Sequence, residues 1–241
     1  MVKQILKKIG LYTFVKKQIC NLKLLKRKME RVDKHIIMDY CRKQTVKKLH
    51  IGCGDNILKD WLNSDLFPSS RDILLLDATK PLPFGSNIFD YVFSEHLIEH
   101  ISYSQGLQML KECYRILKRN GKIRISTPNL SFLLDLYKDN TSEFQKRYIK
   151  CATDTFIGNV PCSHATFVIN NFMRAWGHTF IYDEKLLCTS LEQVGFTMIV
   201  KCDLKDSKDE ILRNLENERR MPLDFLKLET MTLEGTKITD S

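Results

Sequence analysis

Residues 46–54 read Val-Lys-Lys-Leu-His-Ile-Gly-Cys-Gly, and this stretch decides the fold. It begins as a short apolar strand and ends in a turn with glycine at positions 52 and 54. Glycine has no side chain, so the backbone N–H groups of such a turn can approach a ligand closely. A strand followed by a glycine turn is common, however, so the turn alone does not identify a ligand, and the segments after it must be considered.

Six more short apolar runs follow, separated by turns and by segments of helical periodicity. One helix is expected to end at Asn120-Gly121, and another to begin after the capping residue Asp183 and end before Gly195. Strands that alternate with helices predict an α/β fold with a Rossmann-like, seven-stranded, mostly parallel sheet and helices on both faces. The predicted strands are residues 46–51, 61–66, 73–76, 90–94, 122–126, 196–201 and 225–233.

Three segments lie outside this alternation. Residues 130–177 have a helical pattern and many apolar and aromatic side chains, so we expect a helical insert that covers the site as a substrate cap. Residues 203–224 are highly charged and are expected to form a helical, solvated link. Residues 1–45 form a basic arm, which leaves residues 46–241 as one domain that includes the cap.

The basic arm carries most of the chain's positive charge. Residues 1–48 hold fifteen Lys and Arg against three acidic residues, a balance of +12, so the remainder carries −3 of the total of +9. Apolar residues recur at helical spacing in two stretches, Val2, Ile5, Leu6, Ile9 and Tyr12, then Ile19, Leu22, Leu25, Met29 and Val32. Such a helix can pack on the domain, lie on an anionic membrane or dock on a partner protein; nucleic acid is the least favoured partner.

Composition excludes several classes of protein. Hydrophobic residues make up 43% of the chain, which excludes wholesale disorder, and no uncharged apolar run reaches the roughly 18 residues of a membrane span. Lysines interrupt the first ten residues, so we expect no secretory signal there. The eight cysteines form no CxxC pair and are expected to be reduced thiols. We therefore expect a cytoplasmic protein, with the arm available to a membrane surface.

Polar residues follow four consecutive predicted strands. The first strand ends in the glycine turn, the second at Asp65, the third at Asp77-Ala78 and the fourth at Ser94-Glu95-His96. In an open parallel sheet, ligands bind at the carboxyl ends of the strands, near the point where the strand order reverses. A carboxylate at the end of the second strand is placed to accept hydrogen bonds from ribose hydroxyls. Together these strand ends predict one shared binding site.

The same segments resemble the class I S-adenosylmethionine (SAM)-dependent methyltransferases, most closely the branch called methyltransferase type 11, over about residues 46–235. Residues 61–65 and 178–183 are similar to a subgroup associated with polysaccharide and cell-surface glycan biosynthesis. The resemblance implies a SAM-dependent enzyme that O-methylates a sugar hydroxyl of a saccharide or glycan intermediate. The matching runs are Leu49–Gly54, Leu75–Ala78, Leu82–Phe84, Ile88–Ser94, Leu97–His100 and Leu117–Ile125.

The resemblance also implies which residues hold the cofactor. Gly52 and Gly54 would line the methionine part of SAM, and Asp65 would hold the ribose hydroxyls. Further contacts would come from Asp77 to the adenine amino group, from the Ala78 backbone beside it, from Ser94 under the sulfonium, and from His50, Cys53 and Leu66 along the same site. The chain departs from the family at His50, where an acidic residue is common, and at Asn56, where a glycine or small residue is common.

Methylation of a sugar hydroxyl calls for a general base, because such hydroxyls are very weak acids. His96 is the first candidate, with Glu95 to orient it or share its proton. His178, at the end of the insert, is the second candidate and His164 a weaker third. The alternative interpretation makes Glu95 a helix N-terminal acid and His96 a polar residue at the rim of the site.

The histidines around Glu99 and the cysteine of the glycine turn are expected to be packed residues, not a metal site and a nucleophile. His96 and His100 lie four residues apart with Glu99 beside them, but the sequence offers no evident third ligand. We therefore expect packed histidines and no metal. Cys53 is expected to be a small residue between close-packed glycines rather than a nucleophile.

Three other functions remain open from the sequence. The fold also suits a small-molecule or quinone-type methyltransferase. The basic arm suggests a nucleic-acid methyltransferase, although the fourth strand is followed by Ser94-Glu95-His96 instead of an Asn or Asp, two prolines and an aromatic residue. A SAM-binding assembly module without turnover is compatible with the departures at His50 and Asn56.

Overall fold

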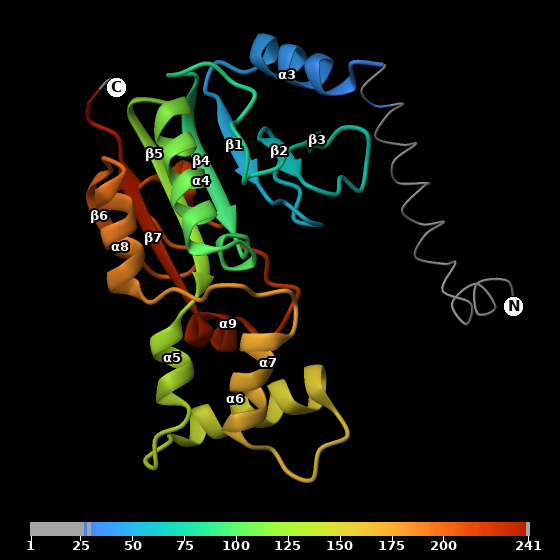
Figure 1. Cartoon of the computed structure of the whole chain (residues 1–241), viewed down its shortest axis with the longest axis vertical. Helices are drawn as coiled ribbons and strands as arrows, with labels where there is room; N and C mark the ends of the chain where they lie inside the picture. Colours follow the sequence, from blue (N-terminus) through green and yellow to red (C-terminus); the bar gives the residue numbers. More distant parts are fainter. Residues whose placement is uncertain (1–26, 28–29, 240–241) are drawn as a thin grey trace, which may run out of the picture.

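The computed structural model describes Arg27 and residues 30–239, and its centre is one seven-stranded sheet with the order β3-β2-β1-β4-β5-β7-β6 (Figure 1). Strands β1 to β5 are parallel, and β7 runs antiparallel to both of its neighbours. This confirms the predicted fold class. The strands are β1 Lys48–Ile51, β2 Leu62–Asp65, β3 Leu74–Leu75, β4 Phe89–Glu95, β5 Leu117–Pro128, β6 Thr197–Cys202 and β7 Thr230–Thr236.

The strand order reverses at β1, which pairs with β2 on one side and β4 on the other. Ile51, the last residue of β1, lies opposite Ser64 of β2 and opposite Ser94 of β4. The glycine turn that follows Ile51 is therefore at the switch point of the sheet, where an open α/β sheet binds its ligand.

Two helices cover one face of the sheet (Figure 1): α4, Tyr103–Ile116, and α8, Glu184–Gln193. A capping box of Ser102 and Gln105 begins α4, and the Asp183 side chain caps α8 as predicted. Their apolar residues join the strands in the main hydrophobic core, which includes Met109, Leu110, Cys113, Leu187, Leu191, Val92, Ile123 and Leu233. The prediction that the first of these helices ends at Asn120-Gly121 is wrong, because the buried Leu117 pairs with Phe89 and begins β5.

The opposite face is covered by residues 203–217, and the predicted helical, solvated link is wrong. This segment contains one short 3-10 helix, Glu210–Leu212, and its Leu212 and Leu215 pack with Phe93 of β4. Arg124 of β5 points into the same layer and is fully buried. Residues 203–217 pack against the sheet because their carboxylate and carbonyl oxygens form ion pairs and hydrogen bonds with the Arg124 guanidinium.

The ion pairs of Arg124 are short. Its Nε lies 2.7 Å from Glu216 Oε1, and its Nη1 lies 2.5 Å from Glu234 Oε1. Nη1 also donates to the backbone carbonyl of Asp206, at 2.9 Å. A buried charge is tolerated only when it is paired and hydrogen-bonded in this way.

The strand predicted at 225–233 is only partly correct. Helix α9, Leu223–Glu229, takes its first half, and β7 begins at Thr230. Proline at 222 ends the preceding loop at the start of the helix, and Leu226 is buried in a second hydrophobic cluster. The burial of Leu226 therefore favours a helix here over the strand that the local sequence pattern predicts.

The second cluster belongs to the insert, residues 130–177, which we call the cap lobe; it lies below the carboxyl edge of the sheet in Figure 1. Its helices are α5 Leu130–Asp135, α6 Glu143–Ala152, the π-helix η2 Thr153–Ile157, and α7 Ala165–Arg174. Buried residues of these helices pack with one another and with Leu226 of α9, among them Phe132, Leu133, Tyr148, Ile149, Val168 and Phe172. The cap lobe therefore has a hydrophobic core of its own.

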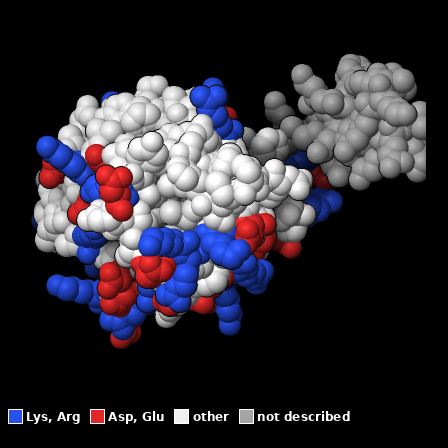
Figure 2. All heavy atoms as spheres, turned by 90° about the horizontal axis from the view of Figure 1, so that it is seen from below, with Lys and Arg blue, Asp and Glu red and all other residues white. Residues whose placement is uncertain are grey.

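Figure 2 shows the molecule from below, which is the end of the cap lobe in Figure 1. Lys and Arg are interleaved with Asp and Glu on this face, beside a broad uncharged area. Exposed ion pairs along α6 and η2 contribute to this mixture, with Lys146 2.6 Å from Glu143 and Lys150 2.8 Å from Asp154. This face carries no separate basic groove.

Only the last part of the arm is described. Helix α3, Val32–Lys43, packs beside β3, and Asp33 accepts hydrogen bonds from the Leu75 amide, at 2.9 Å, and from Arg27. Tyr40 donates to the Lys48 carbonyl at 2.9 Å. The first predicted helix, residues 2–12, and most of the second lie outside the described residues. No helix in the described part is both long and apolar enough to span a bilayer.

We predict that Arg124→Met destabilises the protein by about 3–5 kcal/mol, because Glu216 and Glu234 are left buried without their cation. Chemical denaturation measures the change. The matched control is Lys146→Met, which removes an exposed pair and is expected to cost less than about 1 kcal/mol. A cost for Arg124→Met as small as that of the control would contradict the role given to this network.

Candidate functional site

The glycine turn is fixed to the neighbouring strand by backbone hydrogen bonds. The amides of Gly52 and Cys53 both donate to the Ser64 carbonyl at 2.9 Å. Gly52 has φ +73°, and a Cβ there would lie 2.1 Å from Leu97 Cδ1, so only glycine fits. Gly54 has φ +51°, and a Cβ there would meet nothing within 4 Å, so this end of the turn opens to a free space.

The two predicted carboxylates lie on adjacent strand ends at the same edge. Asp65 Oδ2 accepts from the Gly54 amide at 2.9 Å, and the Asp65 carbonyl accepts from the Leu76 amide at 3.0 Å. Asp77 Oδ1 accepts from the amide and hydroxyl of Thr79. Both side chains are half-buried, and a carboxylate has about four lone-pair sites, so each keeps sites for a ligand. Leu66 beside Asp65 is 47% exposed, and Ala78 beside Asp77 is buried.

Polar atoms without partners lie under the glycine turn. Ser94 Oγ and His50 Nε2 are buried and have no hydrogen-bond partner among the described residues. The His50 ring is fully buried against Phe93, with Nδ1 3.3 Å from Asn63 Oδ1. Burial lowers the pKa of His50 to about 4, against the opposing effect of Asn63, so the ring is neutral at pH 7. Unpaired buried donors and acceptors at a strand edge are what a polar ligand would satisfy.

These features fit the SAM contacts implied by the sequence. The open side of Gly54 gives room for the methionine part, Asp65 and Asp77 offer carboxylate oxygens, and Ser94 offers an unpaired hydroxyl. When bound, SAM supplies an electrophilic methyl group on a sulfonium. Burial raises the pKa of the Cys53 thiol to about 11, which favours the protonated form and so agrees with the expectation of a packed residue.

His96 lies directly beyond Ser94, in a left-handed backbone conformation with φ +46°. Its amide donates to the Ser126 carbonyl at 2.8 Å, and its Nε2 lies 3.4 Å from Thr230 Oγ1. Its Nδ1 lies 3.1 Å from Glu99 Oε1, and the Glu99 side chain is fully buried. A non-glycine residue held at positive φ costs about 1–3 kcal/mol, and such strain is concentrated at functional sites.

The prediction that Glu95 orients His96 is wrong, because Glu99 lies against His96 instead. Glu95 accepts from the Asn217 amide at 3.0 Å and from Asn56 Nδ2 at 3.2 Å, and it lies 3.6 Å from Arg220. Burial raises its pKa, with the charges of His96 and Arg220 acting in the opposite direction. Glu95 therefore holds the loop that covers the second face of the sheet.

Glu99 is the functional residue that the sequence-based assignment of partners missed. It lies in the 3-10 helix η1, Ile98–His100, three residues after His96. Residues three apart share one side of a helical turn, and this spacing was the signal that could have identified it. Its second oxygen, Oε2, accepts from the Thr127 hydroxyl at 3.0 Å.

His178 reaches the same place from the cap lobe. Two consecutive residues with positive φ, Trp176 and Gly177, turn the chain sharply just before it. The Thr179 amide then donates to the Glu99 carbonyl at 2.7 Å, which fixes the turn against η1. His178 Nδ1 lies 2.8 Å from the Phe172 carbonyl, and its ring centroid lies 4.9 Å from that of His100. The structure therefore brings the predicted His96 and His178 both close to Glu99.

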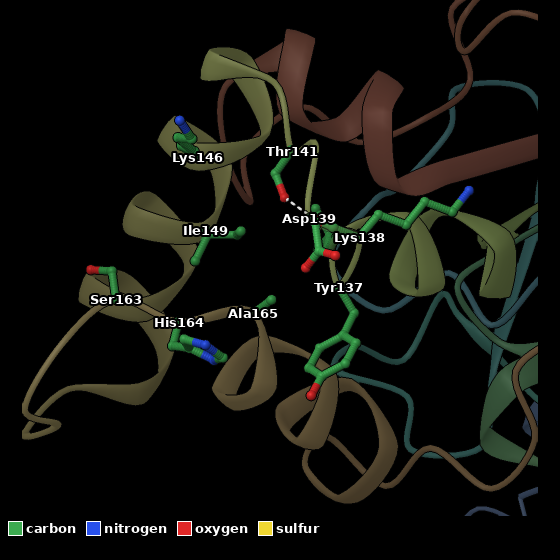
Figure 3. A pocket seen from close by; sticks show the side chains of 10 residues that line it. Tyr137, Lys138, Asp139, Thr141, Lys146, Ile149, Ser163, His164 and Ala165 are labelled. Atoms are coloured by element: carbon green, nitrogen blue, oxygen red, sulfur yellow. Dashed lines mark hydrogen bonds between the residues drawn. The ribbon is translucent and has the colours of Figure 1, made fainter.

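His164 lies elsewhere, at a cavity of about 370 Å³ inside the cap lobe (Figure 3). The cavity is bounded by the turn after α5, by α6 and by the start of α7, with Tyr137, Lys138, Lys146 and His164 among its lining residues. None of the strand-end residues lines it. His164 is exposed and accepts a hydrogen bond from the Thr166 amide at 3.1 Å, so it caps α7 instead of joining His96 and His178.

Comparison with known families identifies the central part of the chain. Residues 49–125 match the family model described as "Methyltransferase domain". This part of the chain is therefore similar to a methyltransferase domain. The match covers β1 to β5 and includes Gly52, Asp65, Asp77 and Ser94. The match supports the predicted enzyme class, a methyltransferase, and with it the predicted cofactor, SAM.

Solved structures resemble this methyltransferase in fold. A SAM-dependent methyltransferase from Archaeoglobus fulgidus is 18% identical, with a TM-score of 0.46 over 94% of this chain and 100% of that one. A SAM-dependent methyltransferase from Mesorhizobium loti is 13% identical, with a TM-score of 0.47 over 80% and 91%. A possible exported protein from Bordetella parapertussis is 13% identical, with a TM-score of 0.49 over 87% and 68%.

These likenesses are too distant to support any inference about substrate, since every TM-score is below 0.5. No curated protein is significantly similar to the chain. The acceptor must therefore be argued from the site itself.

We predict that Asp65→Asn and Asp77→Asn each weaken SAM binding about 10- to 100-fold, because each removes a charged acceptor worth about 1.5–3 kcal/mol. Calorimetry with SAM and with its demethylated product measures the affinities. Asp154→Asn, which removes an exposed carboxylate paired with Lys150 on the cap lobe, is the control and should bind as the wild type does. Unchanged affinity in both site variants would remove these two residues from the cofactor site.

Proposed function

We propose that this methyltransferase moves the methyl group of SAM to a hydroxyl oxygen of a saccharide or glycan intermediate. The observation that carries the proposal is the pair of His96 and the buried Glu99, next to Ser94 at the carboxyl end of β4. Support also comes from the sequence resemblance of residues 61–65 and 178–183 to glycan-biosynthesis methyltransferases.

His96 serves in this proposal as the general base. A sugar hydroxyl must lose its proton as it attacks the methyl group, and a positioned base contributes typically 10²–10⁴-fold to such a step. Burial alone would raise the pKa of Glu99, but its interactions with His96 and His100 outweigh burial and lower it, so the carboxylate is ionised. Its negative charge, 3.1 Å from His96 Nδ1, stabilises the imidazolium that forms when Nε2 takes the proton.

Aromatic side chains of the cap lobe give the acceptor a surface. Trp176 is 46% exposed and Phe156 37% exposed, with ring centroids 5.3 Å apart. The Trp176 ring also lies 5.6 Å from that of His178. Exposed aromatic faces offer apolar contact area together with nearby polar groups, which suits the mixed apolar and polar surface of a sugar ring. The interleaved charges of the face in Figure 2 do not favour a nucleic-acid acceptor there.

We predict that His96→Asn slows methyl transfer by about 10²–10⁴-fold and leaves SAM affinity unchanged, because the variant loses only the base. Asparagine is chosen because it tolerates positive φ better than most residues. The measurement is incorporation of labelled methyl groups from SAM in a screen of saccharide and sugar-nucleotide acceptors. His164→Ala, a change at an exposed histidine of the cap lobe, should keep the wild-type rate.

Two results would overturn this proposal. One is a near-normal rate in His96→Asn with an accepted saccharide. The other is label found only in amines, quinones or nucleic acid when these are offered beside saccharides.

We also propose that residues 1–26 hold the enzyme at an anionic membrane surface or at a glycosyltransferase there. This segment has seven lysines and no acidic residue, and each basic residue near anionic headgroups adds about 1 kcal/mol. Deleting residues 1–26 keeps α3, which packs on the domain, and should abolish co-sedimentation with phosphatidylserine vesicles. If the segment only packs on the domain, the deletion lowers the melting temperature and vesicle binding is the same with and without it.

A further inference from the structure

The histidines around Glu99 form a cluster that the sequence could not show. Within η1, Glu99 and His100 are two adjacent polar residues, and the nearby His96 lies against Glu99 itself. The fold supplies the third residue, because His178 arrives from the end of the cap lobe. One donor atom from each of Glu99, His100 and His178 lies within 4.8 Å of the others.

The backbone holds these residues in place. The amides of Thr179 and Phe180 both donate to the Glu99 carbonyl, at 2.7 Å and 3.1 Å. The Thr179 hydroxyl donates to the His100 carbonyl at 3.2 Å. These three bonds lock the segment after His178 to η1, so the cluster does not depend on side-chain contacts alone. Ligand groups on such a fixed frame lose little conformational freedom when they bind.

The hydrogen bond of His178 leaves one of its ring nitrogens available to a cation. A carbonyl oxygen can only accept, so His178 Nδ1, 2.8 Å from the Phe172 carbonyl, carries the hydrogen and leaves Nε2 with a free lone pair. Metal-binding histidines typically donate their other N–H to a backbone carbonyl in this manner.

Glu99 supplies the negative charge of the cluster. Its side chain is fully buried, and its Oε1 accepts no well-aligned hydrogen bond among the described residues, although His96 Nδ1 is only 3.1 Å away. Its Oε2 is engaged by Thr127. A buried, ionised oxygen without an aligned donor is costly unless a cation or proton donor satisfies it.

We propose that Glu99, His100 and His178 bind a divalent transition-metal ion of the Zn²⁺ class. Two imidazole nitrogens and one carboxylate oxygen are a ligand set of catalytic zinc sites, which keep a fourth position open. Bonds of about 2.0–2.2 Å place the ligand atoms roughly 3.3 Å apart in a tetrahedral site. The donor atoms lie within 4.8 Å of one another, so metal binding would have to draw them closer by side-chain rotation.

A cation at this position would lie beside His96, where the proposed function places the acceptor hydroxyl. A metal ion lowers the pKa of a bound hydroxyl or water and orients it, so it would favour loss of the hydroxyl proton. This consequence rests on the proposed function. Metal binding itself does not, and it can be measured without SAM or acceptor.

The test is titration of the full chain, first treated with a chelator, with Zn²⁺ by calorimetry and with Co²⁺ by visible absorption. The expected result is one high-affinity site per chain whose cobalt spectrum lacks sulfur-to-metal charge transfer, since the ligands are nitrogen and oxygen. His100→Ala, a change at an exposed residue, should weaken this site at least tenfold, and so should His178→Gln once circular dichroism shows that it is folded. The matched controls His35→Ala and His164→Ala remove exposed histidines elsewhere and should bind as the wild type does.

The proposal is overturned if the wild type shows no such site, if the cobalt spectrum reports thiolate ligands, or if His100→Ala binds as tightly as the controls. Those results would leave the assignment of SAM binding and of His96 untouched. Conversely, a wild-type metal site in an enzyme that transfers no methyl group to saccharides would refute the proposed acceptor alone.

Discussion

The burial of one carboxylate, that of Glu99, is the constraint on which the candidate site depends. An ionised group in the interior is stable only when other polar groups come to it. Here the Thr127 hydroxyl approaches from β5, His96 from the end of β4, and His178 from the cap lobe. The need to satisfy this charge therefore brings the edge of the sheet and the insert together at one point, beside the open side of the glycine turn.

A second buried charge organises the other face of the sheet. Arg124 of β5 draws in Glu216 and Glu234, and the loop that carries Glu216 covers Phe93 with apolar side chains. The same loop reaches the site, because Asn217 donates to Glu95. Glu95 thus links the layer around Arg124 to the strand end that carries His96, which explains why a carboxylate next to the candidate base does not contact it.

The sequence predicted the sheet well because each parallel strand is a short apolar run bounded by turn residues. It also placed Gly52, Asp65, Asp77 and Ser94 at one edge, since the carboxyl ends of parallel strands share that edge. It failed where burial of a particular residue overrides local pattern. Residues 203–217 have the composition of a solvated segment, but they pack against the buried Arg124. Residues 225–229 have a strand-like pattern, but they form a helix whose Leu226 is buried in the second hydrophobic cluster.

By itself, the sequence determined the α/β sheet, the glycine turn and the row of polar strand ends, because these follow from hydrophobic periodicity and from backbone conformations that only certain residues adopt. The proximity of His96 and Glu99 was also within its reach, since they are only three positions apart in the chain. Only the tertiary structure decided that His178 faces Glu99 and His100. No local rule relates residues that far apart in the chain, and their contact is produced by the packing of the cap lobe and by the amides of Thr179 and Phe180 on the Glu99 carbonyl.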